Sequence, residues 1–191
     1  RLPACEHQRV APAHAVRDLC RRGVLDLVSP AQRSSDVTGA YSLTGATSFT
    51  LNATGALSAS GGQNVTDAAG TDTLATVDIN GTKAVDVGTI TSTAMTTVAV
   101  DAASGTLTYG AIGGDSTKMS SVELTSAAGA IEGDAAIGLN TNASALSVTA
   151  SAKDAIDLGA IISTKVGNVS ITNTNPLAKA LDVGAIGSDA T

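Results

Sequence analysis

Apolar and polar residues alternate in short runs along most of this chain. Residues 122–133, VELTSAAGAIEG, hold one such run, a turn of small residues and the start of a second run. This layout occurs six times after residue 41. The first runs are FTL at 49, VDI at 77, VAV at 98, VEL at 122, LSV at 146 and VSI at 169. Alternation with a period of two, rich in β-branched residues, predicts β-strands that bury one face.

A second apolar run follows each turn. The second runs are LSA at 57, VDV at 85, LTY at 107, IEG at 131, IDL at 156 and LDV at 181. Four of them continue into Gly-x-Ile, as VGTI, YGAI, LGAI and VGAI. Successive first runs begin 21 to 28 residues apart. This near-even period predicts an all-β fold, a parallel β-helix (β-solenoid) with coils of ~22–25 residues.

In such a solenoid each run lies over its counterpart in the next coil, about 4.8 Å away. Matching the runs position by position predicts three inward columns: Val77, Val98, Val122, Leu146 and Val169; Ile79, Val100, Leu124, Val148 and Ile171; and Val85, Leu107, Ile131, Ile156 and Leu181. It also predicts two outward columns: Ser58, Asp86, Thr108, Glu132, Asp157 and Asp182; and Thr50, Asp78, Ala99, Glu123, Ser147 and Ser170. The expected core is therefore a stack of aliphatic side chains.

The competing fold is antiparallel. NGTK lies between VDI and AVDV and has the composition of a hairpin turn, as do AASG and SAAG. Stacked hairpins or a β-sandwich would then form, with residues 77–79 paired to 85–87. We favour the solenoid because the spacing is even while the turns vary in length, which solenoid corners tolerate.

The composition agrees with a regular stack and limits the partners. Hydrophobic residues make up 43% of the chain, but aromatic residues only 2%. A net charge of −6 leaves no basic patch to neutralise phosphates, so we expect no nucleic-acid partner. No apolar run approaches the ~18 residues that cross a bilayer, so we expect no transmembrane segment in this fragment.

The composition changes near residue 37. All six arginines, both cysteines and both histidines precede it, whereas all five lysines follow it. We therefore divide the chain into residues 1–36, irregular or disordered, and residues 37–191, a β-solenoid repeat domain. A short helix around residues 16–28 and an out-of-frame origin also stay open for the first segment. Its cysteines and histidines match no common zinc pattern, and a disulfide between them would need an oxidising compartment.

The repeats resemble those of large bacterial surface proteins. LTSAAGAIEG, VGNVSITNTN and the Gly-x-Ile steps are similar to the strand repeats of filamentous-haemagglutinin-like and autotransporter-like adhesins, and of Ser/Thr/Ala-rich surface-layer proteins. The resemblance covers residues 41–191 in pattern and composition. It implies export, an extracellular or bacterial cell-surface location, and adhesion or coat formation. The implied partners are a host or neighbouring-cell surface, a glycan, or like subunits.

The two ends of the repeat region suggest a piece of a longer protein. Residues 181–191, LDVGAIGSDAT, repeat residues 107–117, LTYGAIGGDST, and then stop. A solenoid needs a polar cap over its last coil. We therefore expect the chain to be truncated in the middle of a repeat.

The repeat region offers little for catalysis, since residues 37–191 contain no His and no Cys to act as base or nucleophile. Carboxylates occupy the outward position of the second runs at Asp86, Glu132, Asp157 and Asp182. Like charges stacked at strand spacing repel unless a cation bridges them, which makes these four residues weak calcium candidates. A solvated acidic face is the favoured interpretation. We predict no enzyme, no catalytic or cofactor-binding residues, and no cofactor unless calcium binds.

The predicted function is that of a structural or adhesive repeat fragment of an exported bacterial cell-surface protein. The alternative is a self-assembling surface-layer protein. A calcium-binding module is disfavoured. So is an ice-binding module, because the outward columns mix acidic residues with threonine where ice binding would need threonines in register.

Overall fold

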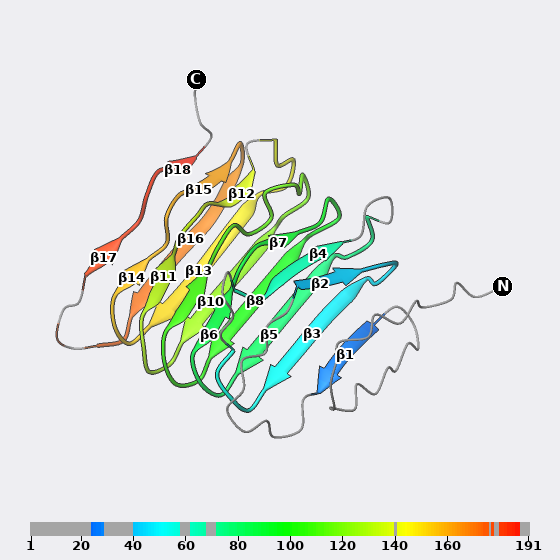
Figure 1. Cartoon of the computed structure of the whole chain (residues 1–191). Coiled ribbons are helices and arrows are strands. Elements are labelled where there is room, and N and C mark those ends of the chain that lie inside the picture. The colour runs from blue at the N-terminus through cyan, green and yellow to red at the C-terminus, as the bar shows by residue number, and fades with distance from the viewer. Residues whose placement is uncertain are drawn as a thin grey trace.

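The solenoid is the architecture of the computed structural model. The structure describes residues 24–28, 40–57, 62–67, 72–139, 141–175, 177 and 180–187. Strands and turns, with no helix, make up these ranges. The strands stack side by side in about six turns, with β1–β3 at one end and β16–β18 at the other (Figure 1). The predicted parallel β-solenoid is confirmed.

The antiparallel alternative is wrong. It required β5 (Thr76–Gly81) and β6 (Val85–Val87) to pair with each other. Instead β5 pairs in parallel with the first strands of the coils before and after it, and β6 pairs in parallel with the second strand of the next coil. The NGTK segment is therefore a corner between two walls and not a hairpin turn.

Three walls enclose the core. The first wall is a seven-stranded parallel sheet in the order β1-β3-β5-β8-β10-β13-β16. Its other strands are β1 (Val24–Val28), β3 (Ser48–Ala53), β8 (Thr97–Ala102), β10 (Ser121–Ser126), β13 (Leu146–Ala152) and β16 (Val166–Asn173). The second wall has five strands, which are β6, β9 (Leu107–Tyr109), β11 (Ile131–Gly133), β14 (Ile156–Asp157) and β17 (Leu181–Asp182).

The third wall was not predicted as a separate element. Its strands are β2 (Ala40–Leu43), β4 (Asn64–Asp67), β7 (Ile90–Thr91), β12 (Ile137–Leu139), β15 (Ile161–Ser163) and β18 (Ile186–Gly187). Bridges from Ile112 to Ile90 and to Ile137 join its two halves. The isoleucines of the Gly-x-Ile steps therefore build this wall.

The glycines of these steps allow close stacking where the second wall leads to the third. A Cβ atom on Gly110 would lie 3.0 Å from the Gly88 carbonyl oxygen, and one on Gly184 would lie 2.7 Å from the Gly159 oxygen. Gly159 also has φ +58°, a conformation that favours glycine. Backbone thus packs directly on backbone at this corner.

Strand β1 extends the first wall into the segment expected to be irregular. It pairs in parallel with β3, and its sequence, VLDLV, has the same period-two alternation as the repeats. The helix considered for residues 16–28 is therefore not formed at Val24–Val28. The rest of residues 1–36, with its cysteines and histidines, lies outside the described residues.

The predicted register holds up to β10. Val77 pairs with Val98 and Val98 with Val122, as expected. The inward column of the second wall is also confirmed, since its strands pair in the order Val85, Leu107, Ile131, Ile156 and Leu181.

The predicted register is wrong at β13, by two residues. Val122 pairs with Val148 and not with Leu146, and Leu124 pairs with Ala150 and not with Val148. Strand β13 is longer than β10, with seven residues against six, so its pairing begins further along the strand. A shift of two keeps every inward residue inward, and Leu146 stays fully buried. The prediction therefore found the correct face but the wrong neighbours.

Polar side chains close the corner between the third and first walls. Five of them are buried: Asp67, Ser92, Ser116, Asn142 and Ser163. Each accepts a hydrogen bond from a backbone N–H a few residues ahead. Ser116 Oγ also donates to the Met95 carbonyl, and Asn142 Nδ2 to the Met119 carbonyl, both in the preceding coil. These bonds satisfy turn backbone that would otherwise be buried without partners.

Tyr109 is the largest buried side chain and occupies space in two coils. Its hydroxyl donates to the Leu158 carbonyl oxygen at 2.6 Å. Its register partner is Gly133, where a Cβ atom would lie 2.4 Å from the tyrosine oxygen. Burial, and secondly the carboxylate of Asp157, raise the pKa of Tyr109 well above its ordinary value of 10.0. Glycine in one coil therefore makes room for the aromatic ring of the coil before it.

The alternation in β10 predicts unequal losses of stability. Leu124 is fully buried, whereas its neighbour Glu123 is exposed. We expect Leu124→Ala to lower the free energy of unfolding by about 2–5 kcal/mol, because the stack cannot fill the void. Glu123→Ala should change it by less than ~0.5 kcal/mol. Urea melts of both variants provide the test, and equal losses would mean that the strand is buried on both faces.

The buried tyrosine predicts a loss of stability at alkaline pH. Because the folded state raises the pKa of Tyr109, the unfolded chain ionises first as the pH passes 10.0. The stabilisation is therefore complete below that pH and is lost above it. Tyr109→Phe should lose about 1–3 kcal/mol at neutral pH, since the Leu158 carbonyl loses its donor. Its stability should then fall less steeply than that of the unchanged chain up to about pH 11. Parallel slopes in urea melts would contradict this assignment.

Candidate binding surfaces

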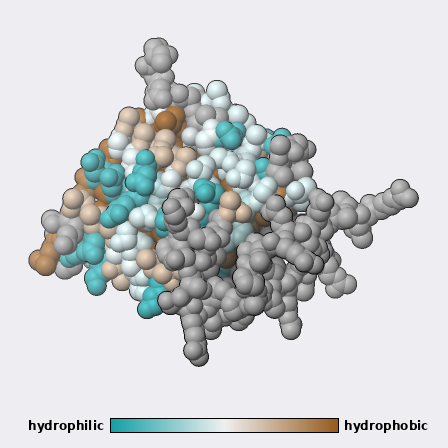
Figure 2. Space-filling model, viewed as in Figure 1, coloured by the Kyte–Doolittle hydropathy of each residue, from teal (hydrophilic) through white to brown (hydrophobic). Residues whose placement is uncertain are grey.

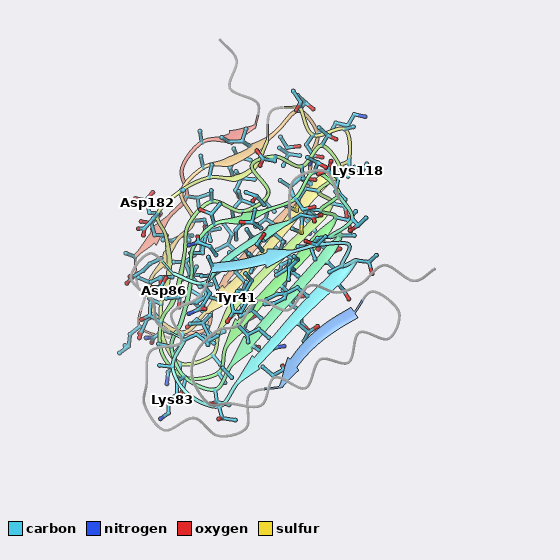
Figure 3. All side chains as sticks on the ribbon, turned by 45° about the vertical axis from the view of Figure 1, so that its right-hand side comes forward. Tyr41, Lys83, Asp86, Lys118 and Asp182 are labelled. Carbon is cyan, nitrogen blue, oxygen red and sulfur yellow. The ribbon has the colours of Figure 1, made fainter. Side chains whose placement is uncertain are left out.

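The four acidic candidates lie in one outward row of the second wall. Register pairing places Asp86, Thr108, Glu132, Asp157 and Asp182 in consecutive coils. This is the predicted column, although Ser58 lies outside the described residues. Asp86 and Asp182 lie along the same side of the solenoid (Figure 3). Thr108 separates Asp86 from the other three carboxylates, so only Glu132, Asp157 and Asp182 are direct neighbours.

The row supplies one carboxylate per coil and does not converge on a point. Glu132, Asp157 and Asp182 are exposed to solvent. Asp157 Oδ1 accepts a hydrogen bond from the Gly159 backbone N–H at 3.1 Å. No group of three or more His, Cys, Asp or Glu side chains suited to a metal ion occurs among the described residues. The row is thus a line of negative charge with a spacing of about 4.8 Å.

The outward face of the first wall carries three rows of polar residues. The first row is Ser48, Thr76, Thr97, Ser121 and Ser147, all with hydroxyl groups. The central row is Thr50, Asp78, Ala99, Glu123, Thr149 and Ser170. The third row is Asn52, Asn80, Asp101, Thr125, Ser151 and Thr172. The prediction placed Ser147 in the central row, which is wrong because of the shift at β13. It missed the first and third rows.

Hydroxyl groups at the corners and on the first wall have different hydrogen bonds. At the corners, Thr96 Oγ1 donates to the Ala75 carbonyl, and Ser104 Oγ to the Thr82 carbonyl, so these hydroxyls tie one coil to the one before it. In the first row, no hydrogen bond to another described residue engages the hydroxyls of Thr76, Thr97 or Ser121. These hydroxyls can therefore donate to, and accept from, an outside molecule.

A shallow open groove of about 370 Å³ follows the third row where the first wall turns toward the second. Its lining comprises Asn52, Ala53, Thr54, Asn80, Gly81, Thr82, Asp101 and Ala103. Asn80 Nδ2 donates to Asn52 Oδ1 at 3.1 Å and to Asp78 Oδ1 at 3.0 Å. Both amide protons are thus engaged, which fixes the side chain and leaves its carbonyl oxygen as an acceptor. Gly81 is required here because a Cβ atom would lie 2.4 Å from Val85 Cγ2.

The groove has the polar groups that a polyhydroxylated ligand needs. The Asn80 carbonyl oxygen and the Asp101 carboxylate accept hydrogen bonds, while the Asn52 amide donates them. Sugar hydroxyls both donate and accept, so this mixture suits them. The groups come from three successive coils, and only stacking in register brings them together.

Comparison of the chain with protein-family models, with curated proteins and with solved structures found no match. The likeness to bacterial surface repeats is therefore one of fold pattern and composition, and the function has to be argued from the surfaces themselves.

The described part of the chain contains no helix of the length and hydrophobicity that crosses a membrane.

The acidic row predicts that neutralising its middle member stabilises the solenoid. Asp157 lies between Glu132 and Asp182, so Asp157→Asn removes repulsion from both neighbours and keeps the oxygen that accepts from Gly159. We expect a gain of about 0.2–1 kcal/mol at low salt, which high salt should remove. The matched control is Asp86→Asn, whose partner in the next coil is Thr108, and it should gain less.

Calcium titration of the same variants separates the two interpretations of the row. If calcium bridges the carboxylates, it should raise the melting temperature of the unchanged chain more than that of Asp157→Asn. An equal response in both would leave the row as a solvated acidic face.

Proposed function

We propose that this chain is a structural and adhesive repeat module of an exported bacterial cell-surface protein, and that the outward face of the first wall binds glycan. The observation that carries the proposal is the in-register arrangement of polar side chains over six coils, from β3 to β16. It gives a long regular face that carries hydroxyl, amide and carboxylate groups.

The stacking itself supports the structural role. Backbone hydrogen bonds link each coil to the next along the axis of the solenoid, as in the pairs Val85 N–H to Thr106 carbonyl and Leu107 N–H to Ala130 carbonyl. Six coils at strand spacing extend over about 29 Å. Adding coils lengthens such a rod without changing its cross-section, which suits a stalk that holds a binding surface away from a cell.

The outward face of the first wall supports the adhesive role. A polysaccharide repeats its hydroxyl groups along its length, and the face repeats its polar groups along the solenoid axis. Many weak contacts of the same kind then add up to useful affinity. The groove beside Asn52, Asn80 and Asp101 is open, so it can admit an internal stretch of a glycan chain as well as its end.

A self-assembling surface layer is the second candidate. The feature that favours it is the exposure of aliphatic side chains on the coil formed by β16, β17 and β18. Like the adhesive module, it places the chain outside the cell and assigns it no enzymatic activity.

Glycan binding by the first wall can be tested with isosteric variants. We expect the purified chain to bind one or more immobilised polysaccharides, and Thr97→Val or Asn80→Ala to weaken that binding about 2- to 10-fold for each hydrogen bond removed. The matched control is Thr108→Val, the same change on the outward face of the second wall, which should bind like the unchanged chain. Equal loss in all three variants, or no binding by the folded chain, would contradict the proposal.

A separate experiment tests the location. Antibody labelling of intact bacteria that produce the protein should detect it on the cell surface, and brief protease treatment should remove the label. Signal only after the cells are broken would contradict export.

A further inference from the structure

The coil formed by β16, β17 and β18 exposes aliphatic side chains at positions that are buried in every other coil. Leu181 is 57% exposed and Ile186 50%. Their register partners one coil earlier are Ile156 and Ile161, which are 1% and 0% exposed. Hydrophobic side chains, in brown, lie along the left rim of Figure 2, where Figure 1 places β17 and β18. The exposed face is therefore the cross-section of the core.

The backbone at this coil is open as well. Strands β16, β17 and β18 each end the order of their sheets. An edge strand presents N–H and C=O groups that pair with a further strand. Three edges and the apolar side chains between them face the same way, along the axis of the solenoid (Figure 1). A flat partner or a single extended peptide would satisfy only part of this surface.

The sequence of the coil indicates the chemistry of the partner. Residues 181–187, LDVGAIG, match residues 107–113, LTYGAIG, at five of seven positions. Leu107 and Ile112 are fully buried, because Ile131 and Ile137 of the next coil pair with them. Leu181 and Ile186 occupy the same positions, so the surface that fits them is another coil of this solenoid, with aliphatic residues in the same register.

The opposite end of the chain offers such a surface. Strand β1 ends the first wall and β2 ends the third wall. These are the walls to which β16 and β18 belong, and all strands of a wall run in the same direction. The β1–β2 end of one molecule can therefore continue the walls that β16 and β18 begin, with parallel pairing throughout.

We propose that the β16–β18 coil binds the β1–β2 end of a second copy of this chain, so that the solenoid continues from one molecule into the next. Both surfaces are formed in the folded chain, so little ordering opposes association. The contact joins different surfaces and its symmetry does not close, so it generates an open filament. The inference uses the ends of the solenoid and not its outward faces, so it stands or falls independently of glycan binding.

Sedimentation and electron microscopy of the purified chain test the proposal. We expect filaments one solenoid wide, whose length grows with protein concentration. Leu181→Lys and Ile186→Lys should give monomers with an unchanged circular-dichroism spectrum, since both positions are exposed in the single molecule. The matched control is Thr172→Lys, which adds the same charge to the same coil on its outward face and should leave the filaments intact.

Cross-linking tests the direction of the contact. Asp26 of β1 pairs with Thr50, and Ser170 of β16 belongs to the same row of the first wall. In a background with Cys5→Ser and Cys20→Ser, a short bismaleimide should join Asp26→Cys molecules to Ser170→Cys molecules in a mixture. Ser170→Cys molecules alone should stay unlinked.

Three results would overturn the proposal. The unchanged chain could remain monomeric at every concentration, as it would if other residues of the same molecule covered the coil. Assembly could persist in Ile186→Lys, which would place the contact on an outward face. Cross-links between two Ser170→Cys molecules would mean that like ends meet.

Discussion

Stacking of each coil on the next at strand spacing is the constraint on which the whole molecule depends. Every inward residue packs on its counterparts one coil before and one coil after, so a large side chain must meet a small one. Tyr109 shows this directly, because its ring and hydroxyl fill the space left by Gly133. Gly88 and Gly110 show it for the backbone, which approaches too closely for a Cβ atom. A core rich in Val, Ile and Ala and nearly free of aromatic residues follows from this constraint.

The same constraint divides the polar residues into two groups. Corner residues such as Ser116 and Asn142 are buried and bind the backbone of the preceding coil, so they hold the stack together. Residues that face outward on the walls do not have to bind the protein, and stacking arranges them in straight rows. A row of hydroxyls invites contact with a repeating ligand, whereas the row of Glu132, Asp157 and Asp182 accumulates repulsion.

A solenoid has two kinds of surface, and they suit different partners. The outward faces are polar and regular, and they grow with each added coil, so they fit the adhesive role that we propose. The ends are sections through the core, with open backbone and aliphatic side chains, so they fit another coil of the same kind. Adhesion and end-to-end assembly therefore do not compete for the same residues, and one fibre can do both.

The sequence by itself determined what depends on local alternation and on even spacing. Period-two runs identified the strands of the first two walls, and the period of the repeat favoured parallel stacking over hairpins. Matching of runs then placed Asp86 and Asp182 in one row before any coordinates were consulted.

Only the tertiary structure decided the rest. The third wall was missed because its strands are too short for alternation to show, as at Ile90–Thr91. The slip at β13 was missed because a shift of two residues leaves a period-two pattern unchanged. The groove was missed because Asn52, Asn80 and Asp101 lie 21 to 28 residues apart in sequence, and only the register of three coils makes them neighbours.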